Sequence, residues 1–195
     1  MILMTHVLDK KDLTVLLIGS GGREHAIAHQ IAKSQRCKKL YIASGNPGTF
    51  QCGENVDIPG DNIPELVSFV KNNDVDITFV GPEQPLALGI VDVFQSEGLA
   101  IVGPNKEAAQ LESSKAWAKK KYADYGMPTA DYAEFSDVDA AIQYVTEKNM
   151  FPIVIKADGL AAGKGVTIAT SLEMAIKALQ DCLVDAVFKD AGSTV

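Results

Sequence analysis

The sequence predicts an α/β protein in two parts, an N-terminal domain built on a mostly parallel sheet and a smaller α+β module after it. The chain has 195 residues, of which 47% are hydrophobic and 22% charged, as expected for one large or two small globular domains. Strand-like runs alternate with helical patterns up to Gly103, which is typical of βαβ units. Near the C-terminus two strand-like runs follow each other too closely for a crossover helix, which favours a hairpin.

The first domain is expected over residues 13–126, after a loosely attached extension of residues 1–12. Leu13–Gly19 is a continuous apolar run that ends in glycine, as in a strand buried on both faces. A helical pattern follows, and residues 39–43 predict the next strand. Residues 44–59 contain five glycines or prolines and predict a long functional loop. The remaining elements expected here are a helix over 63–72, a strand over 76–81, a helix over 85–97 and a strand over 99–103. This order predicts a Rossmann-like domain.

The second domain is expected over residues 127–195. Helical stretches over 106–111 and 113–125 run into Gly126-Met127-Pro128, and proline cannot continue a helix. We therefore expect the domain boundary there. The elements expected beyond it are an extended segment over 130–135, a helix over 137–148, a strand over 152–157, a glycine-rich loop, a strand over 166–169 and a helix over 172–183.

Composition argues against several classes of partner. Eighteen Lys and Arg stand against 25 Asp and Glu, and a net charge of −7 disfavours binding to nucleic acid or anionic membranes through bulk charge. The three cysteines show no metal-ligand spacing and suit a reducing compartment. The apolar run at residues 1–4 is too short for a signal sequence or a membrane span. We expect a cytoplasmic protein without a nucleic-acid or membrane partner.

A first glycine turn, Gly19–Gly22, lies between the first strand and the first helix. Backbone amides at such a helix start form an anion site. The dinucleotide fingerprint fails because Glu24 stands where its third glycine belongs and no acid ends the second strand. A small molecule that carries a phosphate is favoured, with Arg23 as a further donor. A tight turn without a ligand remains the alternative.

A second glycine loop runs from Asp158 to Gly165. A P-loop would need glycine at 158 and a hydroxyl residue at 165, and it would lead into a helix rather than a strand. The loop follows Lys156 at a strand end. These features favour a mobile hairpin tip that folds over nucleotide phosphates. A purely structural hairpin is the alternative.

Other charged residues give weaker signals. Lys115 follows the N-cap pair Ser113-Ser114, where a cation opposes the helix dipole, and this favours an anionic ligand nearby. Lys119–Lys121 are most simply a solvated helix face. Glu83 follows a strand at the edge where α/β sheets bind ligands, although first-turn acids are common. His25 and His29 have metal-ligand spacing without a third ligand, so we expect no metal site.

Six motifs in a fixed order carry a resemblance to a known family. They are Gly19-Ser-Gly-Gly-Arg-Glu-His25, Gly45-Asn-Pro-Gly-Thr49, Val80-Gly-Pro-Glu-Gln-Pro-Leu86, Gly103-Pro104, Ala109-Gln-Leu-Glu-Ser-Ser-Lys115 and Ile155-Lys-Ala-Asp-Gly-Leu-Ala-Ala-Gly-Lys-Gly165. Each alone is common, but together they resemble the phosphoribosylamine–glycine ligases (glycinamide ribonucleotide synthetases), which are ATP-grasp enzymes of purine biosynthesis. The resemblance extends from about residue 15 to the end of the chain.

The resemblance implies an activity and its cofactors. The family joins glycine to 5-phosphoribosylamine through a glycyl phosphate and releases ADP and phosphate, using ATP with Mg²⁺ or Mn²⁺. It implies that the parallel-sheet part is the pre-ATP-grasp domain and that the second part is an incomplete small ATP-grasp subdomain. The chain then corresponds to the N-terminal part of a longer enzyme and is catalytically incomplete alone, with catalytic residues unassigned and metal ligands expected elsewhere. A monomer is favoured.

The resemblance also implies two sets of binding residues. Those for ATP are Lys115, Lys156, Gly159, Leu160, Ala161, Ala162, Gly163, Lys164 and Gly165. Those for phosphoribosylamine are Gly19, Ser20, Gly21, Gly22, Arg23, Asn46, Pro47, Gly48, Thr49, Glu83, Pro85 and Leu86. Two alternatives remain open: an ATP-grasp ligase or carboxylase of another specificity, such as a biotin carboxylase, and a non-catalytic nucleotide-binding protein.

Overall fold

The structure, a computed structural model, divides the chain into two compact units, Met1–Ala109 and Gln110–Val195. It describes residue 7 and residues 9–160, 165–185, 187 and 193–195. Each unit has its own hydrophobic core, and each is described by itself.

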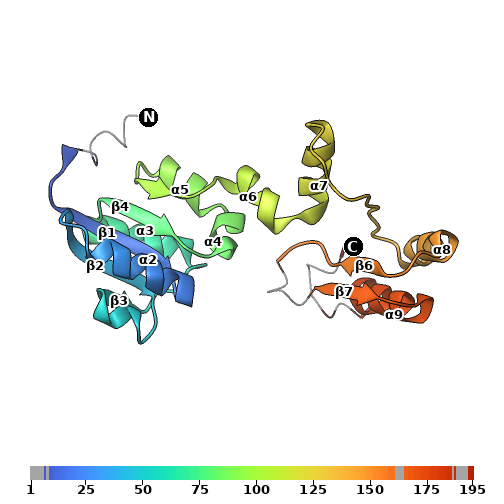
Figure 1. The fold of residues 1–195 in the computed structure, drawn as a ribbon. Coiled ribbons are helices and arrows are strands. Elements are labelled where there is room, and N and C mark those ends of the chain that lie inside the picture. The colour runs from blue at the N-terminus through green and yellow to red at the C-terminus, as the bar shows by residue number, and fades with distance from the viewer. Residues whose placement is uncertain (1–6, 8, 161–164, 186, 188–192) are drawn as a thin grey trace. The chain divides into compact units, whose positions relative to one another are not determined.

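The first unit contains a parallel sheet, as the sequence predicts, and this sheet has five strands (Figure 1). Its strands are β1 (Leu13–Gly19), β2 (Cys37–Ser44), β3 (Glu54–Val56), β4 (Ile77–Val80) and β5 (Ile101–Val102), in the order β3-β2-β1-β4-β5. Its helical elements are α2 (Gly22–Ala32), η1 (Thr49–Gln51), α3 (Ile63–Asn72), α4 (Glu83–Leu88) and α5 (Ile90–Ser96).

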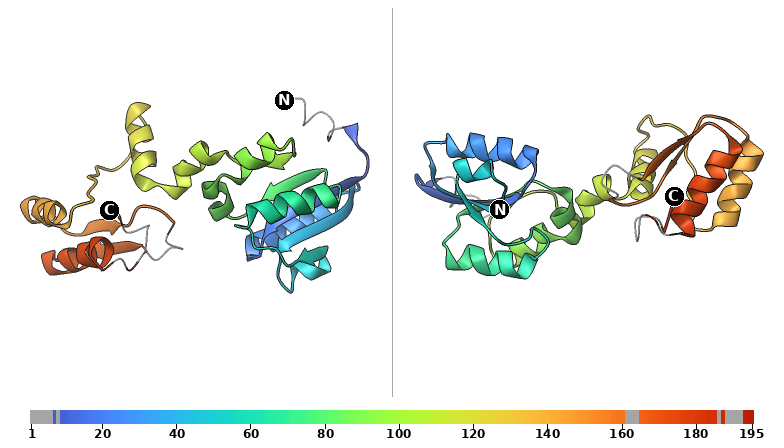
Figure 2. Two further views of the ribbon diagram at one scale, coloured as in Figure 1. Left: turned by 180° about the vertical axis from the view of Figure 1, so that it is seen from behind. Right: turned by 90° about the horizontal axis from the view of Figure 1, so that it is seen from below.

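Both faces of this sheet are covered by helices (Figure 2). Successive residues of β1 point to opposite faces: Leu16 and Ile18 join the core beneath α3 and α5, whereas Val15 and Leu17 join the core beneath α2. All four side chains are buried, and each contributes about 1.5–3 kcal/mol on full burial. The continuous apolar run of β1 thus fixes the centre of the sheet, and its last residue ends at the sheet's carboxyl edge.

Two elements of the first unit differ from the prediction. The expected long loop over 44–59 contains η1 and the short strand β3, which pairs in parallel with β2. The expected single helix over 85–97 is broken into α4 and α5. Gly89 lies between them with φ = +93°, and this left-handed conformation ends α4.

The second unit packs an antiparallel hairpin against two helices. Its elements are α7 (Lys115–Asp124), α8 (Val138–Lys148), β6 (Ile153–Lys156), β7 (Val166–Ala169) and α9 (Leu172–Leu183), while α6 (Lys106–Ser113) spans the division between the units. The hairpin is antiparallel, as predicted. Helices α8 and α9 lie side by side over one face of it (Figure 2), where Val145, Ile155 and Leu179 form the core.

The division between the units lies earlier than the boundary expected after Gly126. Gly126 and Pro128 do follow a helix end, because α7 stops at Asp124. However, α7 belongs with the hairpin: the carboxylate of Asp158 binds the start of this helix. The expected boundary at 126/127 therefore falls inside the second unit.

Candidate functional site

A pocket of about 350 Å³ opens at the carboxyl edge of the parallel sheet, where α/β folds bind ligands. We call it the glycine-turn pocket. Residues at or just after the ends of β1, β2 and β4 line it, together with residues that precede α3. They are Gly19, Ser20, Gly21, Glu24, Ala43, Ser44, Gly60, Asp61, Pro82, Gln84 and Pro85.

A buried acid, Glu24, is one of the residues that line this pocket. It is only 3% exposed, and its carboxylate accepts hydrogen bonds from the Gly21 amide (2.7 Å) and from Nε of Arg23 (3.0 Å). A Cβ atom at Gly19 or Gly81 would collide with Cγ of Glu24. Glycine at positions 19 and 81 therefore leaves room for the side chain of Glu24.

Glu24 also occupies one of the backbone donors of the turn. The Gly21 amide is already engaged, so it can meet a phosphate only by giving up the carboxylate of Glu24. A buried carboxylate beside the helix start also repels additional negative charge. Both effects oppose the close approach of any phosphate group to the Gly21 amide.

Arg23 bridges two carboxylates at the rim. Besides Glu24, its Nη2 donates to Oε2 of Glu83 at 3.1 Å. The hydrogen bond to Glu24, and then that to Glu83, raises the pKa of Arg23. The pKa of Glu83 is lowered, first by its own backbone N–H at the start of α4 and then by Arg23. The guanidinium is thus held at the rim and is not among the groups that line the pocket.

Hydrogen bonds connect the predicted loop over residues 46–49 to the glycine turn. Oδ1 of Asn46 accepts the amides of Gly48 (2.7 Å) and Thr49 (3.0 Å), and its Nδ2 donates to the Ser20 carbonyl oxygen (2.8 Å). Thr49 is fully buried, and its hydroxyl is bonded to the backbone of Asn46 and the side chain of Asn55. The loop therefore supports the position of the turn.

The structure brings together only part of the predicted substrate set. Gly19, Ser20, Gly21 and Pro85 line the pocket. The predicted residues that do not line it are Gly22, Arg23, Asn46, Pro47, Gly48, Thr49, Glu83 and Leu86, of which Leu86 packs against the core. Sequence reasoning missed Ser44, Asp61 and Gln84. The rule that ligands bind beyond strand ends would have found Ser44, because it ends β2.

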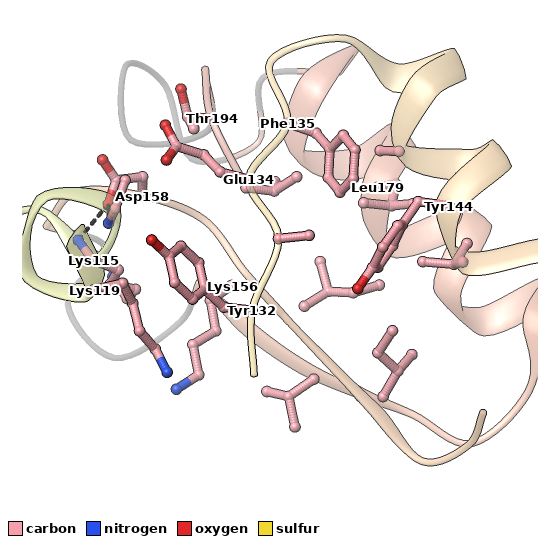
Figure 3. A pocket seen from close by; sticks show the side chains of 18 of the residues that line it. Lys115, Lys119, Tyr132, Glu134, Phe135, Tyr144, Lys156, Asp158, Leu179 and Thr194 are labelled. Atoms are coloured by element: carbon pink, nitrogen blue, oxygen red, sulfur yellow. Dashed lines mark hydrogen bonds between the residues drawn. The ribbon is translucent and has the colours of Figure 1, made fainter. Parts of the chain in front are cut away.

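A second pocket, of about 320 Å³, lies in the second unit between β6, the segment 130–135 and α7. We call it the lysine cleft. Figure 3 shows Lys115 and Lys119 reaching it from α7, Lys156 from β6, and Tyr132 and Phe135 from the extended segment. Core side chains of α8 and α9, including Tyr144 and Leu179, form its apolar end.

The start of α7 is bound to the start of the glycine loop. The carboxylate of Asp158 accepts the amides of Lys115 and Ala116 (3.1 Å to the latter) and the hydroxyl of Ser114 (3.0 Å). The ammonium of Lys115 donates to the Gly159 carbonyl oxygen at 3.0 Å. Asp158 thus places one negative charge beside the Lys115 amide, while the ammonium of Lys115 meets a neutral carbonyl oxygen.

The other two lysines differ in their contacts. Lys119 donates to the Thr129 hydroxyl (2.7 Å) and the Ala130 carbonyl oxygen (2.8 Å), so it is not the simple solvated face that the lysine run suggests. Lys119 lies one turn after Lys115 on the same helix face, and this spacing could have indicated from the sequence that both lysines reach the same cleft. Lys156 is exposed at the end of β6 and has no hydrogen-bond or ion-pair partner within the described ranges.

The outer face of the β6–β7 hairpin is unusually apolar. Val154 stands opposite Ile168, and Lys156 stands opposite Val166, so all four share the face that does not contact the core. Val154, Val166 and Ile168 are 50%, 46% and 62% exposed. A half-exposed hairpin normally carries polar residues there. The apolar residues at these alternate strand positions were visible in the sequence, but the site prediction did not use them.

The ends of the glycine loop are described, but its tip is not. The Ala157 amide donates to the Gly165 carbonyl oxygen (2.8 Å), which closes the hairpin, and Gly159 has φ = +96°. Leu160 is 37% exposed. Four predicted nucleotide-binding residues, Ala161, Ala162, Gly163 and Lys164, lie outside the described residues.

The described part of the chain contains no metal-binding cluster and no membrane-spanning helix. Its His, Cys, Asp and Glu residues form no group of three that could hold a metal ion. All three cysteines are free, and burial raises the pKa of the Cys37 and Cys182 thiols, which disfavours reactive thiolates. None of the described helices is both long and apolar enough to cross a membrane.

A parallel-sheet unit with a glycine turn at its carboxyl edge and a hairpin unit with lysines beside a glycine loop are the arrangement of the ATP-grasp class, which the second matched family model names. Sequence comparison gives the family. The family model described as "Phosphoribosylglycinamide synthetase, N domain" matches residues 13–112, and "Phosphoribosylglycinamide synthetase, ATP-grasp (A) domain" matches residues 113–195. The chain belongs to the phosphoribosylglycinamide synthetase family.

Relatives and solved structures agree with this assignment. A curated phosphoribosylamine–glycine ligase of Yersinia pestis is 49% identical over 185 residues, which cover 94% of this chain and 43% of that protein. The crystal structure of phosphoribosylamine–glycine ligase from Thermotoga maritima aligns with a TM-score of 0.74 and 32% identity over 91% of this chain and 41% of that one. Biotin carboxylase from Campylobacter jejuni, solved as a β-γ-ATP complex, shares the fold with a TM-score of 0.69 at 19% identity, covering 94% of this chain and 44% of that one. The chain thus spans less than half the length of these proteins.

Proposed function

We propose that this chain carries the phosphoribosylamine site and part of the ATP site of a phosphoribosylamine–glycine ligase. In the proposed reaction, the carboxylate of glycine attacks the γ-phosphorus of ATP, giving glycyl phosphate and ADP. The amine of 5-phosphoribosylamine then attacks the acyl carbon, phosphate leaves, and the amine loses a proton to give glycinamide ribonucleotide. The matched family models and the 49% identity to a curated ligase support this proposal.

One observation carries the ATP part of the proposal: the ammonium of Lys115 lies on the Gly159 carbonyl oxygen, at the start of the loop that Lys156 precedes. Two cations from different elements therefore border the same glycine loop. A phosphate chain beside this loop can draw Lys115 away from a neutral carbonyl and can also engage Lys156, which has no partner among the described residues. Each such charge-assisted contact contributes about 1.5–3 kcal/mol.

The outer face of the hairpin offers a place for the adenine ring. Val154, Val166 and Ile168 present aliphatic side chains around Lys156, so a planar base can lie on them while its phosphates reach the lysine. Burying apolar surface contributes about 25 cal/mol per Å², which makes such a face favourable for an aromatic ligand.

The glycine-turn pocket is our candidate site for the sugar phosphate. It lies at the start of α2, where the helix dipole favours a negative group. Ser20, Ser44 and Gln84 offer side-chain hydrogen-bonding groups for a sugar at its rim. These groups suit a polyhydroxyl sugar, and its phosphate would have to take the Gly21 amide from Glu24.

ATP chemistry of this kind uses a divalent cation, which neutralises charge on the transferred phosphoryl group. The described residues form no group that could hold one. We therefore assign the metal to none of the described residues. The free cysteines suit a reducing compartment, and we place the reaction in the cytoplasm.

Nucleotide titration tests the ATP assignment. We expect Lys156→Gln to weaken ATP binding to the chain tenfold or more, since 1.4 kcal/mol corresponds to a factor of about ten. Lys177→Gln is the matched control, because Lys177 is an exposed lysine of the same unit on α9. Equal affinities for the wild type and Lys156→Gln would remove Lys156 from the site.

A second titration tests the sugar-phosphate assignment. Ribose 5-phosphate should shift the amide resonances of residues 20–23, at the start of α2, and NAD should not. Glu24→Gln is informative because it removes the buried negative charge while retaining most of the side-chain volume. It should tighten binding of the sugar phosphate if Glu24 restricts the anion. Shifts produced by NAD alone would contradict the assignment.

A further inference from the structure

Asp158 is not among the predicted ATP-binding residues, although it joins two parts of the lysine cleft, the start of α7 and the start of the glycine loop. Its carboxylate accepts three hydrogen bonds from Ser114, Lys115 and Ala116, residues 42 to 44 positions earlier in the chain. Its own amide donates to the Thr194 carbonyl oxygen at 2.8 Å. Asp158 is therefore fixed at both its backbone and its side chain.

These contacts neutralise the start of α7. The first amides of a helix lack intrahelical acceptors and carry partial positive charge, so a carboxylate there is stabilising. Ser114 already supplies the local cap, because its hydroxyl oxygen accepts the Trp117 amide at 3.1 Å. Asp158 satisfies two further amides and orients that hydroxyl, which donates to Oδ2. The helix start is thus closed to an external phosphate, and Lys115 can contribute only its ammonium.

We propose that Asp158 is a positioning residue for nucleotide binding, which acts by holding the backbone of Lys115 against the start of the glycine loop. This inference rests on the proposed function of the lysine cleft. Asp158 and Gly159 are consecutive, and they bind the amide and the ammonium of the same lysine. Movement of the loop start therefore moves Lys115 with it. Without Asp158, the hydrogen bond that holds the Lys115 backbone to the start of the loop is lost. The ammonium of Lys115 then no longer has a fixed position relative to the phosphates.

The test is a double-mutant cycle in ATP affinity. We expect Asp158→Ala to raise the Kd for ATP about tenfold in the wild-type background and less than twofold when Lys115→Met is already present, because the two residues act as one unit. Asp158→Asn, which keeps the acceptor oxygen without the charge, should recover part of the loss. Equal effects in both backgrounds would overturn the inference.

A matched variant separates positioning from simple helix stability. Asp137 caps α8 in the same unit, accepting the Ala140 amide at 2.8 Å, and does not line the cleft. Asp137→Ala removes a helix cap and should cost a similar amount of stability without changing the Kd for ATP. If Asp137→Ala and Asp158→Ala weaken ATP binding equally, Asp158 acts only through stability and the inference fails.

The outcome also distinguishes this inference from the function on which it rests. If Lys115→Met and Lys156→Gln both leave ATP affinity unchanged, the proposed nucleotide site is wrong. If those two variants weaken binding and Asp158→Ala does not, the site stands and only the positioning role is overturned.

Discussion

At the scale of single residues, Glu24 shows how one buried side chain can shape a glycine turn. In the sequence it appears only as the residue that spoils a dinucleotide fingerprint. In the structure its buried carboxylate holds the Gly21 amide and Arg23, and Gly19 and Gly81 leave space for it. The sequence could predict the turn but not the buried position of this carboxylate, because Gly81, which approaches Glu24, follows β4 and lies 57 residues later in the chain.

Another residue-scale prediction concerns Glu83 and pH. Its pKa is lowered in the folded chain, so its contribution to stability is present above its unfolded pKa, about 4.3, and is lost as the pH falls through the lower folded value. The stability advantage of the wild type over Glu83→Gln should therefore shrink on acidification. Since Arg23 and Glu83 are 61% and 46% exposed, we expect less than about 1 kcal/mol.

Urea denaturation at pH 7, 5 and 3.5 measures this advantage. Glu112→Gln is the control, since Glu112 is exposed and makes no ion pair among the described residues. A wild-type advantage over Glu83→Gln that grows toward low pH would contradict the predicted sign.

At the scale of elements, periodicity and glycine predicted most of the fold. The apolar runs of β1, β4 and the β6–β7 hairpin, and the capped helices α3, α8 and α9, are confirmed within a few residues. The prediction missed β3, since three residues, Glu54–Val56, are too short for a periodic signal and form a strand only by pairing with β2. It also ran α4 and α5 together, because glycine inside an apolar helical pattern does not by itself reveal a left-handed turn.

Gly89 provides the element-scale prediction. With φ = +93°, this position strains any residue that carries a Cβ atom, so Gly89→Ala should destabilise the first unit by about 1–2 kcal/mol. Gly22→Ala is the matched control. Gly22 is helical, and a Cβ atom there would meet nothing within 4 Å, so alanine should be neutral or stabilise by up to about 1 kcal/mol. Thermal unfolding followed by circular dichroism compares them, and a neutral Gly89→Ala would mean that the break does not depend on glycine.

At the scale of the whole molecule, the sequence predicted two parts but placed their division too late. The proline after Gly126 is a strong local signal for a helix end. The bond between Asp158 and the start of α7, in contrast, joins residues more than 40 positions apart and leaves no local pattern. The six ordered motifs were the more informative guide, because they identify the family irrespective of where the units divide.

Separate cores predict separate unfolding transitions. Leu66 is buried in the first unit and Leu179 in the second, and truncation of either to alanine should cost about 2–5 kcal/mol. Trp117, the single tryptophan, lies on α7 in the second unit, so its fluorescence follows that unit alone. Leu179→Ala should shift the fluorescence transition, and Leu66→Ala should shift only the circular dichroism. A Leu66→Ala variant that shifts both signals equally would show that the chain unfolds as one unit.

We expect the aliphatic outer face of the β6–β7 hairpin also to affect how the polypeptide behaves in concentrated solution. Val154, Val166 and Ile168 form an apolar sheet surface without a covering element in the described part of the chain, and such surfaces promote self-association. Lys156 places one positive charge on this surface, which opposes the stacking of two copies face to face. The lysine that we assign to phosphate binding would thus also keep the free chain dispersed, and a nucleotide that covers the face should raise its solubility.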